Sequence, residues 1–359
     1  MTIDSFRFLR LAVVWGALSI AFAAPARAAD EPPAPAAEAP APPVPAATDT
    51  TAAAAQAAPA ATAVTTATPG TPAAPTTPPP PYSLPWQLRP VAAVNVIRSD
   101  TAVAFYDNGM GASGSTVATM LLASYKLTPS LAPLVRLGVS QNDAPAAGVD
   151  GTSFVNPIVG LTFAKKVDSI RWAAFGGATV PIGGGGGNMP DAGAALANAA
   201  GIRARSAMDN AMFAVNYFTA ILGGGVAYVD HKLTVQVEAT LLQLFRVRGD
   251  MAAAATDSTR TNSTVGLHAG YFIIPMLSLG GELRYQRWLT HPTQLAMGMA
   301  VDIPSNAMDT VTMAIGPRAH FQVGKGLWLR PGIAYARGLD TPLTTSSYNM
   351  VQVDIPFYF

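Results

Sequence analysis

The sequence contains no cysteine, which excludes disulfide bridges, thiolate metal sites, cysteine nucleophiles and a lipidated N-terminal cysteine. Charge is also scarce, because Asp, Glu, Lys and Arg make up only 12% of the chain, against about 25% in ordinary soluble proteins. The formal net charge of +1 offers no basic surface for nucleic acid. Together with a mean hydropathy of +0.29, this composition argues against a soluble enzyme with a conventional solvated surface.

The N-terminus has the three parts of a secretory signal peptide. Arg7 and Arg10 form a basic flank, Leu11 to Ala24 form the apolar segment, and Ala26-Arg27-Ala28 is a small-x-small cleavage site. The alternative is an uncleaved membrane anchor, but the apolar segment is shorter than the roughly 20 residues of a membrane span. We therefore expect residues 1–28 to be removed on export.

Residues 29–86 have the composition of a disordered linker. They contain no Lys or Arg, no aromatic residue before Tyr82, and repeated Ala, Pro and Thr. Such a segment cannot bury enough apolar surface to offset the entropy of ordering, so we expect an extended chain with polyproline II character. It is either a periplasmic tether or envelope spacer that contacts a periplasmic or cell-wall component, or a compositionally drifting tail without a partner.

Beyond residue 86 the dominant pattern is alternation of apolar with polar or small residues. In the last segment, period two places five apolar residues on one face of a strand, namely Val351, Val353, Ile355, Phe357 and Phe359. The pattern predicts twelve strands. They are expected at residues 87–98, 114–127, 131–141, 154–164, 170–181, 220–229, 232–247, 263–273, 276–289, 309–322, 327–337 and 348–359.

The connections between these strands alternate in length, which is typical of transmembrane β-barrels. Short turns are expected at residues 128–130, 165–169, 230–231, 274–275 and 323–326. Long loops are expected at residues 99–113, 142–153, 182–219, 248–262, 290–308 and 338–347. Most strands also have the length that a tilted strand needs to cross a bilayer.

With these features, residues 87–359 resemble the Gram-negative outer-membrane β-barrel superfamily. The resemblance rests on the signal peptide, the alternating strands and the C-terminal Val351 to Phe359, which is similar to the family's assembly signal. It implies an all-β fold, a transmembrane antiparallel up-and-down barrel in the outer membrane, with bound lipid and the barrel-assembly machinery as partners. The linker would then lie in the periplasm. The resemblance implies no single activity.

Two other architectures fit less well. A soluble β-sandwich would carry charge on its outward faces, whereas here one face of each strand is apolar. A transmembrane helix over residues 211–229 is opposed by Gly223-Gly224-Gly225 and Asn216.

Catalytic chemistry is not indicated. The run Gly183 to Gly187 lacks the Lys-Ser/Thr of a phosphate loop, and the four histidines are dispersed without metal-site spacing. No His is followed by the Ser-Asn-Gly segment of barrel phospholipases, and no acidic pair with His marks a barrel protease. We expect no enzyme activity, no cofactor and no metal.

Several ionisable residues fall on the face opposite the apolar one and should line the barrel interior, because Arg facing lipid costs about 2–4 kcal/mol near the midplane. These residues are Arg136, Glu238, His268, Glu282, Arg284, Arg318 and Arg330. They form either a salt-bridge ladder that fills the interior or a constriction that sorts solutes by charge.

The long segment 182–219 contains a predicted helix with Asp191 as its N-cap. It is a plug in the lumen, a lid across the mouth or an external loop. The sequence thus predicts a monomeric or weakly oligomeric barrel acting as a narrow passive channel or small-molecule transporter. The alternative is a structural, envelope-tethering or secretion-type barrel without solute transport.

Overall fold

The computed structural model describes residues 82–107, 112–145, 148–249, 257–290, 293–296, 299–302, 308–344 and 346–359. The expected signal peptide and the expected linker up to residue 81 lie outside these residues.

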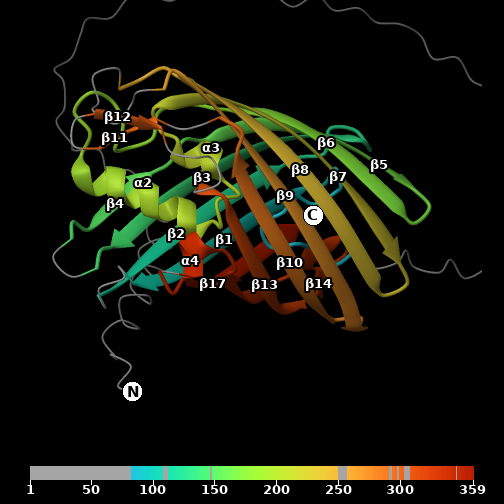
Figure 1. Ribbon diagram of the computed structural model, residues 1–359. Helices are drawn as coiled ribbons and strands as arrows, with labels where there is room; N and C mark the ends of the chain where they lie inside the picture. Colours follow the sequence, from blue (N-terminus) through green and yellow to red (C-terminus); the bar gives the residue numbers. More distant parts are fainter. Residues whose placement is uncertain are drawn as a thin grey trace, which may run out of the picture. The chain divides into compact units, whose positions relative to one another are not determined.

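The chain folds into a closed antiparallel β-barrel of twelve strands, as predicted (Figure 1). Its first six strands are β1 Val96–Asp107, β2 Ser113–Ser124, β3 Leu131–Asp143, β5 Ile158–Val167, β6 Ile170–Thr179 and β7 Tyr217–Asp230. The others are β8 Leu233–Arg246, β9 Thr259–Ile274, β10 Leu277–Trp288, β13 Thr310–Ala319, β16 Gly332–Gly338 and β17 Asn349–Tyr358. Pairing of β1 with β17 closes the barrel, so no sheet edge is left along that seam.

Five short strands and three helices complete the described fold. Strand β4 Gly151–Phe154 pairs with β3, and β14 Phe321–Gly324 and β15 Leu327–Leu329 extend β13 and β16. Strands β11 Thr293–Ala296 and β12 Met299–Asp302 form a separate pair. The helices are α2 Ala192–Ala204, α3 Asn210–Phe213 and α4 Thr341–Thr344.

The alternation of short turns and long loops is present, so one end of the barrel carries the turns and the other carries the loops. For example, β7 and β8 are joined by residues 231–232, whereas β6 and β7 are joined by residues 180–216. We call these the short-turn end and the long-loop end. The C-terminal Phe359 lies at the short-turn end, where its N–H donates to Asn95 O at 3.3 Å.

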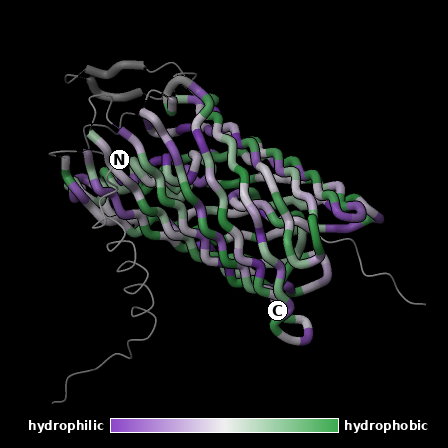
Figure 2. Tube along the Cα trace, turned by 90° about the horizontal axis from the view of Figure 1, so that it is seen from below, coloured by the Kyte–Doolittle hydropathy of each residue, from purple (hydrophilic) through white to green (hydrophobic). Residues whose placement is uncertain are grey.

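Hydrophobic and hydrophilic residues are interspersed along the strands (Figure 2), and many large apolar side chains of the strands are exposed on the outer face. On β9, Leu267 is 42% exposed while its neighbour His268 is fully buried, as period two requires. Aromatic side chains are exposed near both ends, including Tyr125 and Tyr271 toward the turns and Phe245 and Tyr335 toward the loops. A closed sheet with this outer surface suits a lipid environment, with its polar residues turned inward.

Among the described residues, no helix is both long and apolar enough to span a membrane. The alternative helix over residues 211–229 is absent, because residues 217–230 form β7.

The first strand is the main error of the sequence prediction. It begins at Val96 rather than at residue 87, and it continues to Asp107 through part of an expected loop. Residues 82–95, which we call the lumenal segment, have no regular structure and enter the barrel. Its apolar residues have the hydropathy of a lipid-facing strand, but they are buried in the barrel interior. They are Leu84, Trp86, Leu88 and Val91.

The predicted helix in the long connection is present. The Asp191 side chain accepts a hydrogen bond from the N–H of Ala194 at 2.7 Å, which makes it the N-cap of α2. Residues 180–216, which we call the inserted segment, fold into the barrel from the long-loop end, where α2 contacts β1 to β4. Of the three predicted arrangements, the structure therefore has the inward-folded one.

Candidate functional site

The lumenal segment fits against glycines on the inner wall. A Cβ built at Gly266 on β9 would lie 2.7 Å from the Leu88 side chain, and one built at Gly280 on β10 would lie 3.0 Å from the Trp86 ring. These glycines alternate with polar inward residues, so only the absence of a side chain makes room for the segment. The wall is therefore shaped to this stretch of chain.

Wall carboxylates hold the main chain of the lumenal segment. Glu282 accepts hydrogen bonds from the N–H groups of Trp86 and Gln87, the second at 3.3 Å. Glu238 accepts from the main chain of Arg89 and from its guanidinium group, the latter at 2.6 Å. Hydrogen bonds to a charged acceptor are stronger than neutral ones, so both contacts contribute to holding the segment in place.

Wall arginines bind the carbonyl groups of the same segment. Arg98 donates to Pro85 O at 3.0 Å and also to Trp86 O. Arg318 donates to Pro85 O at 3.4 Å. Both guanidinium groups also bind Asp354 of β17, which fixes them in position.

His268 packs against the Trp86 ring in an edge-on arrangement with centroids 6.0 Å apart. Its Nε2 lies 3.4 Å from Ser83 Oγ, and its Nδ1 lies 3.8 Å from Glu282. These contacts make His268 one of the wall residues that bind the lumenal segment. Across the described residues, no group of three His, Cys, Asp or Glu side chains could hold a metal ion.

The inserted segment is fixed by a second set of ion pairs. Arg205, which is fully buried, binds the Asp100 carboxylate at 2.7 and 2.9 Å and Asp209 at 2.8 Å. Arg136 on β3 binds Asp209 as well. Burial by itself raises the pKa of Asp209, but the guanidinium groups of Arg136 and Arg205 outweigh this effect and hold the pKa below its ordinary value.

One polar network joins the two inward-folded segments. Arg284 binds Glu282, which holds the lumenal segment, at 2.7 Å, and it donates to Ser206 Oγ of the inserted segment at 3.2 Å. Gln352 donates to Asp100 at 2.9 Å and to Trp86 O at 3.3 Å. The interior therefore holds a continuous series of hydrogen bonds from the lumenal segment to the inserted segment.

The structure brings most of the predicted lumen residues into this interior. Glu238, His268, Glu282, Arg284 and Arg318 contact the lumenal segment or its partners, and Arg136 contacts the inserted segment. Arg330, between β15 and β16, accepts a hydrogen bond from Arg318 at its main-chain carbonyl at 2.7 Å, while its guanidinium group lies over the rings of Trp328 and Tyr358.

Sequence reasoning missed residues that carry much of the network. Asp100 lies on β1, in a part of the chain for which the hydropathy pattern predicts a loop, and Arg205 and Asp209 follow a helix whose position the sequence leaves open. Pro90 gives no usable signal against a strand at residues 87–98, because Pro133, Pro317 and Pro356 lie within strands of the barrel.

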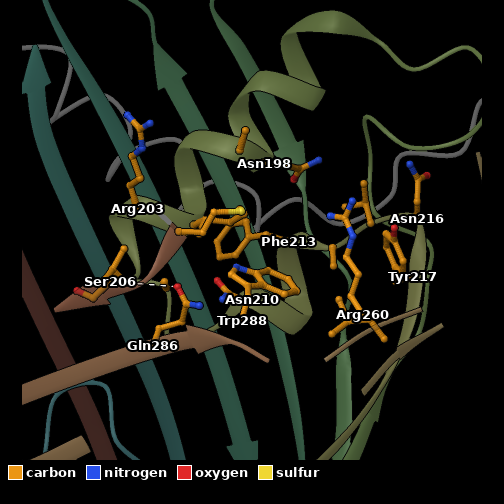
Figure 3. Close-up of a pocket in the computed structure, with 18 of the residues that line it drawn as sticks. Asn198, Arg203, Ser206, Asn210, Phe213, Asn216, Tyr217, Arg260, Gln286 and Trp288 are labelled. Atoms are coloured by element: carbon orange, nitrogen blue, oxygen red, sulfur yellow. Dashed lines mark hydrogen bonds between the residues drawn. The ribbon is translucent and has the colours of Figure 1, made fainter. Parts of the chain in front are cut away.

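A cavity of about 640 Å³ lies at the long-loop end, between the inserted segment and the wall formed by β7 to β10 and β13 (Figure 3). Phe213 and Trp288 contribute aromatic surface, and Asn198, Asn210 and Gln286 contribute amides. Gln286 is two residues from Arg284 on the same inward face, so the network around Arg284 lies next to the cavity toward the short-turn end.

The run Gly183 to Gly187 contributes to the packing of the inserted segment rather than to an open loop. Gly183 N–H donates to Asn156 Oδ1 at 2.9 Å, and Asn198 Nδ2 donates to Gly184 O at 2.7 Å. Gly185 and Gly187 have positive φ values of 69° and 92°, which favours glycine there.

The residues of the expected assembly signal lie on the outward face of β17. Val351, Val353, Ile355 and Phe357 are half-buried and Phe359 is 45% exposed, while the intervening Gln352 and Asp354 are buried in the interior. Their role in assembly stays a prediction.

No family model matches the sequence, and no curated protein matches it. Solved structures with a similar fold are outer-membrane β-barrel proteins. An outer membrane channel from Pseudomonas putida F1 has 13% identity and a TM-score of 0.47, over 76% of this chain and 98% of that one. The NanC porin has 10% identity and a TM-score of 0.42, over 73% of this chain and 100% of that one. The transport unit of the autotransporter AIDA-I from Escherichia coli has 10% identity and a TM-score of 0.41, over 74% and 90%. The fold assignment of this chain rests on its own strand pairing and apolar outer face, which are those of a transmembrane β-barrel.

Proposed function

We propose that the protein is an outer-membrane channel for small solutes, held closed at rest by the lumenal segment. The observation that carries the proposal is the position of this segment. It lies between the short-turn end and the network around Arg284, which adjoins the cavity. Trp86 and Leu88 occupy the interior where a solute leaving the cavity would have to pass.

The lumenal segment can leave without disrupting the barrel. It precedes β1, and in the described chain residues 82–94 form no main-chain hydrogen bond with the main chain of a strand. Their partners are wall side chains such as Glu282, Glu238 and Gln236. Withdrawal would cost these contacts but none of the strand pairing that closes the sheet.

In this proposal the short-turn end, where the N–H of Ser83 donates to Thr234 Oγ1 at 3.0 Å near the β7–β8 turn, faces the periplasm. A contact between the linker and a periplasmic or cell-wall component would then act directly on the segment that closes the lumen. The expected absence of enzyme activity stays a prediction.

The second candidate is a structural barrel that anchors the linker and transports nothing. The buried ion pairs of Arg205 with Asp100 and Asp209 favour it, because they fix the inserted segment in the other half of the interior.

Planar-bilayer conductance distinguishes the two candidates. The test variant is the secreted protein without residues 29–95, which keeps every strand, and the matched control lacks residues 29–81 and keeps the lumenal segment. We expect the test variant to conduct and both the control and the full-length protein to stay mostly closed. A test variant that is folded, as judged by heat-modifiable migration, but carries no current would support the structural barrel.

A further inference from the structure

The cavity at the long-loop end has the size and lining of a small-molecule site. Its volume of about 640 Å³ lies within the roughly 300–1,000 Å³ of ligand pockets. Most of the lining side chains come from two separate parts of the chain, the inserted segment and the strand wall, and none of the described lining residues carries a carboxylate.

We infer that this cavity binds a neutral polyhydroxylated solute of the size of a mono- or disaccharide. The inference deepens the proposed function by naming a substrate class, and it rests on that function for its biological meaning.

Neutral hydrogen-bonding groups dominate the polar part of the lining. They are the amides of Asn198, Asn210, Asn216 and Gln286 and the hydroxyl groups of Ser206 and Thr310. Amides and hydroxyls can both donate and accept, which matches the paired donor and acceptor character of a sugar hydroxyl.

Two of the amides have an unused acceptor. Asn198 is 4% exposed and Asn210 is 3% exposed, and the Oδ1 atom of each has no hydrogen-bond partner among the described residues. A buried acceptor without a donor is unfavourable. Within this site, water or a ligand hydroxyl supplies the missing donor.

Aromatic surface completes the lining. Trp288, Phe213 and Asn210 all line the cavity (Figure 3). An aromatic face offers an apolar surface to the C–H groups of a sugar ring, while the amides bind its edge. This combination fits a hydroxylated ring better than a purely apolar ligand, which would leave the amides without partners.

Charge favours a neutral solute over an anion. Of the two arginines in the lining, Arg260 is bound to Asp257 at 2.8 Å. Arg203 extends away from Phe213 and Trp288 (Figure 3), and its guanidinium group lies 5.9 Å from the Tyr106 ring. Neither arrangement resembles a clamp on a carboxylate, which uses guanidinium groups directed at one point.

Binding to the full-length protein tests the inference without requiring transport. The protein is kept in lauryldimethylamine oxide micelles, because detergents with sugar headgroups would occupy a sugar site. Maltose is the neutral probe, and glucuronate and 2-naphthoate are the acidic and the apolar anionic probes. Calorimetric titration gives the affinity, and tryptophan fluorescence gives the location, since the response to maltose should disappear in Trp288→Phe.

We expect saturable binding of maltose, weaker binding of both anions, and at least a tenfold loss of maltose affinity in Asn210→Leu. Gln322→Leu, at the short-turn end, is the matched control and should bind as the unmodified protein does. If Asn210→Leu does not fold, the loss of the fluorescence response in Trp288→Phe still locates the site. Absence of maltose binding, or tighter binding of either anion, overturns the inference.

The result separates this inference from the proposed function. If maltose does not bind but the variant without residues 29–95 conducts, the substrate class is wrong and the channel stands. If maltose binds but that variant is folded and carries no current, the site stands and the channel does not.

Discussion

Arg205 in the inserted segment donates two hydrogen bonds to the carboxylate of Asp100 on β1, at 2.9 and 2.7 Å. The two residues are far apart in sequence, and both are almost fully buried. This pair ties the long connection between β6 and β7 to the opposite side of the barrel, so the position of α2 is set by a specific contact and not only by packing.

Replacement of Arg205 by Ala should destabilise the barrel strongly. It would leave Asp100 and Asp209 buried without their main cation, and breaking a buried pair on one side costs about 3–5 kcal/mol. Urea titration in lipid vesicles measures the effect. Arg203→Ala is the matched control, because Arg203 lies two residues earlier in the last turn of α2, is exposed and should change stability by less than about 1 kcal/mol. Equal effects of the two changes would contradict the importance of the buried pair.

A side chain at position 266 should displace the lumenal segment. Leucine in place of Gly266 would overlap Leu88, and overpacking of this kind costs about 1–3 kcal/mol. If that cost falls on the closed state alone, it shifts the balance between closed and open states by about 5- to 150-fold. Single-channel recordings should show more frequent opening. Gly281→Leu faces outward with no close neighbour and should leave the recordings unchanged.

Because the chain lacks cysteine, a single introduced thiol reports on the movement of the lumenal segment. Leu88 is fully buried, so Leu88→Cys should react slowly with a polar maleimide in the folded barrel. It should react faster when Gly266→Leu is added. Lys325→Cys, in an exposed short turn, should react rapidly in both backgrounds. Rapid labelling of Leu88→Cys in the otherwise unmodified protein would show that the segment does not occupy the interior at rest.

The outward face of β9 should be intolerant of charge at mid-strand. Leu267→Arg places an ion in lipid and should lower the free energy of unfolding by about 2–4 kcal/mol. Val323→Arg is also outward and exposed, but it lies beside the short turn and should cost about 0–1 kcal/mol. Titration in vesicles gives both values, and a larger cost at position 323 would mean that the membrane does not surround the middle of the strands.

The C-terminal residue should be required for efficient assembly. Phe359→Asp should leave unfolded chain in the periplasm, because the resemblance of the last strand to the assembly signal depends on its terminal aromatic residue. Heat-modifiable migration of membrane fractions measures the yield of folded barrel. Tyr358→Phe keeps both the aromatic character and the terminal Phe and serves as the control. A normal yield from Phe359→Asp would rule out this role.

Period two was sufficient to locate most of the strands and their faces, but not the first strand. It placed Val351 and Val353 outside and His268 and Glu282 inside, and the burial of these residues agrees. Turn lengths gave the up-and-down connectivity, and Asp191 marked the start of α2, because an N-cap depends only on residues next to it in the sequence.

The sequence by itself therefore determined the barrel, its strand number and which residues face inward, since local alternation and turn length fix these features. Only the tertiary structure decided what fills the interior. Leu88 and Val91 are apolar whether they face lipid or pack in the lumen, so residues 87–95 could not be told from a strand by hydropathy. Likewise, the partner of Asp100 is Arg205 because the inserted segment folds inward, and a contact across a barrel depends on the closed shape and not on any local pattern.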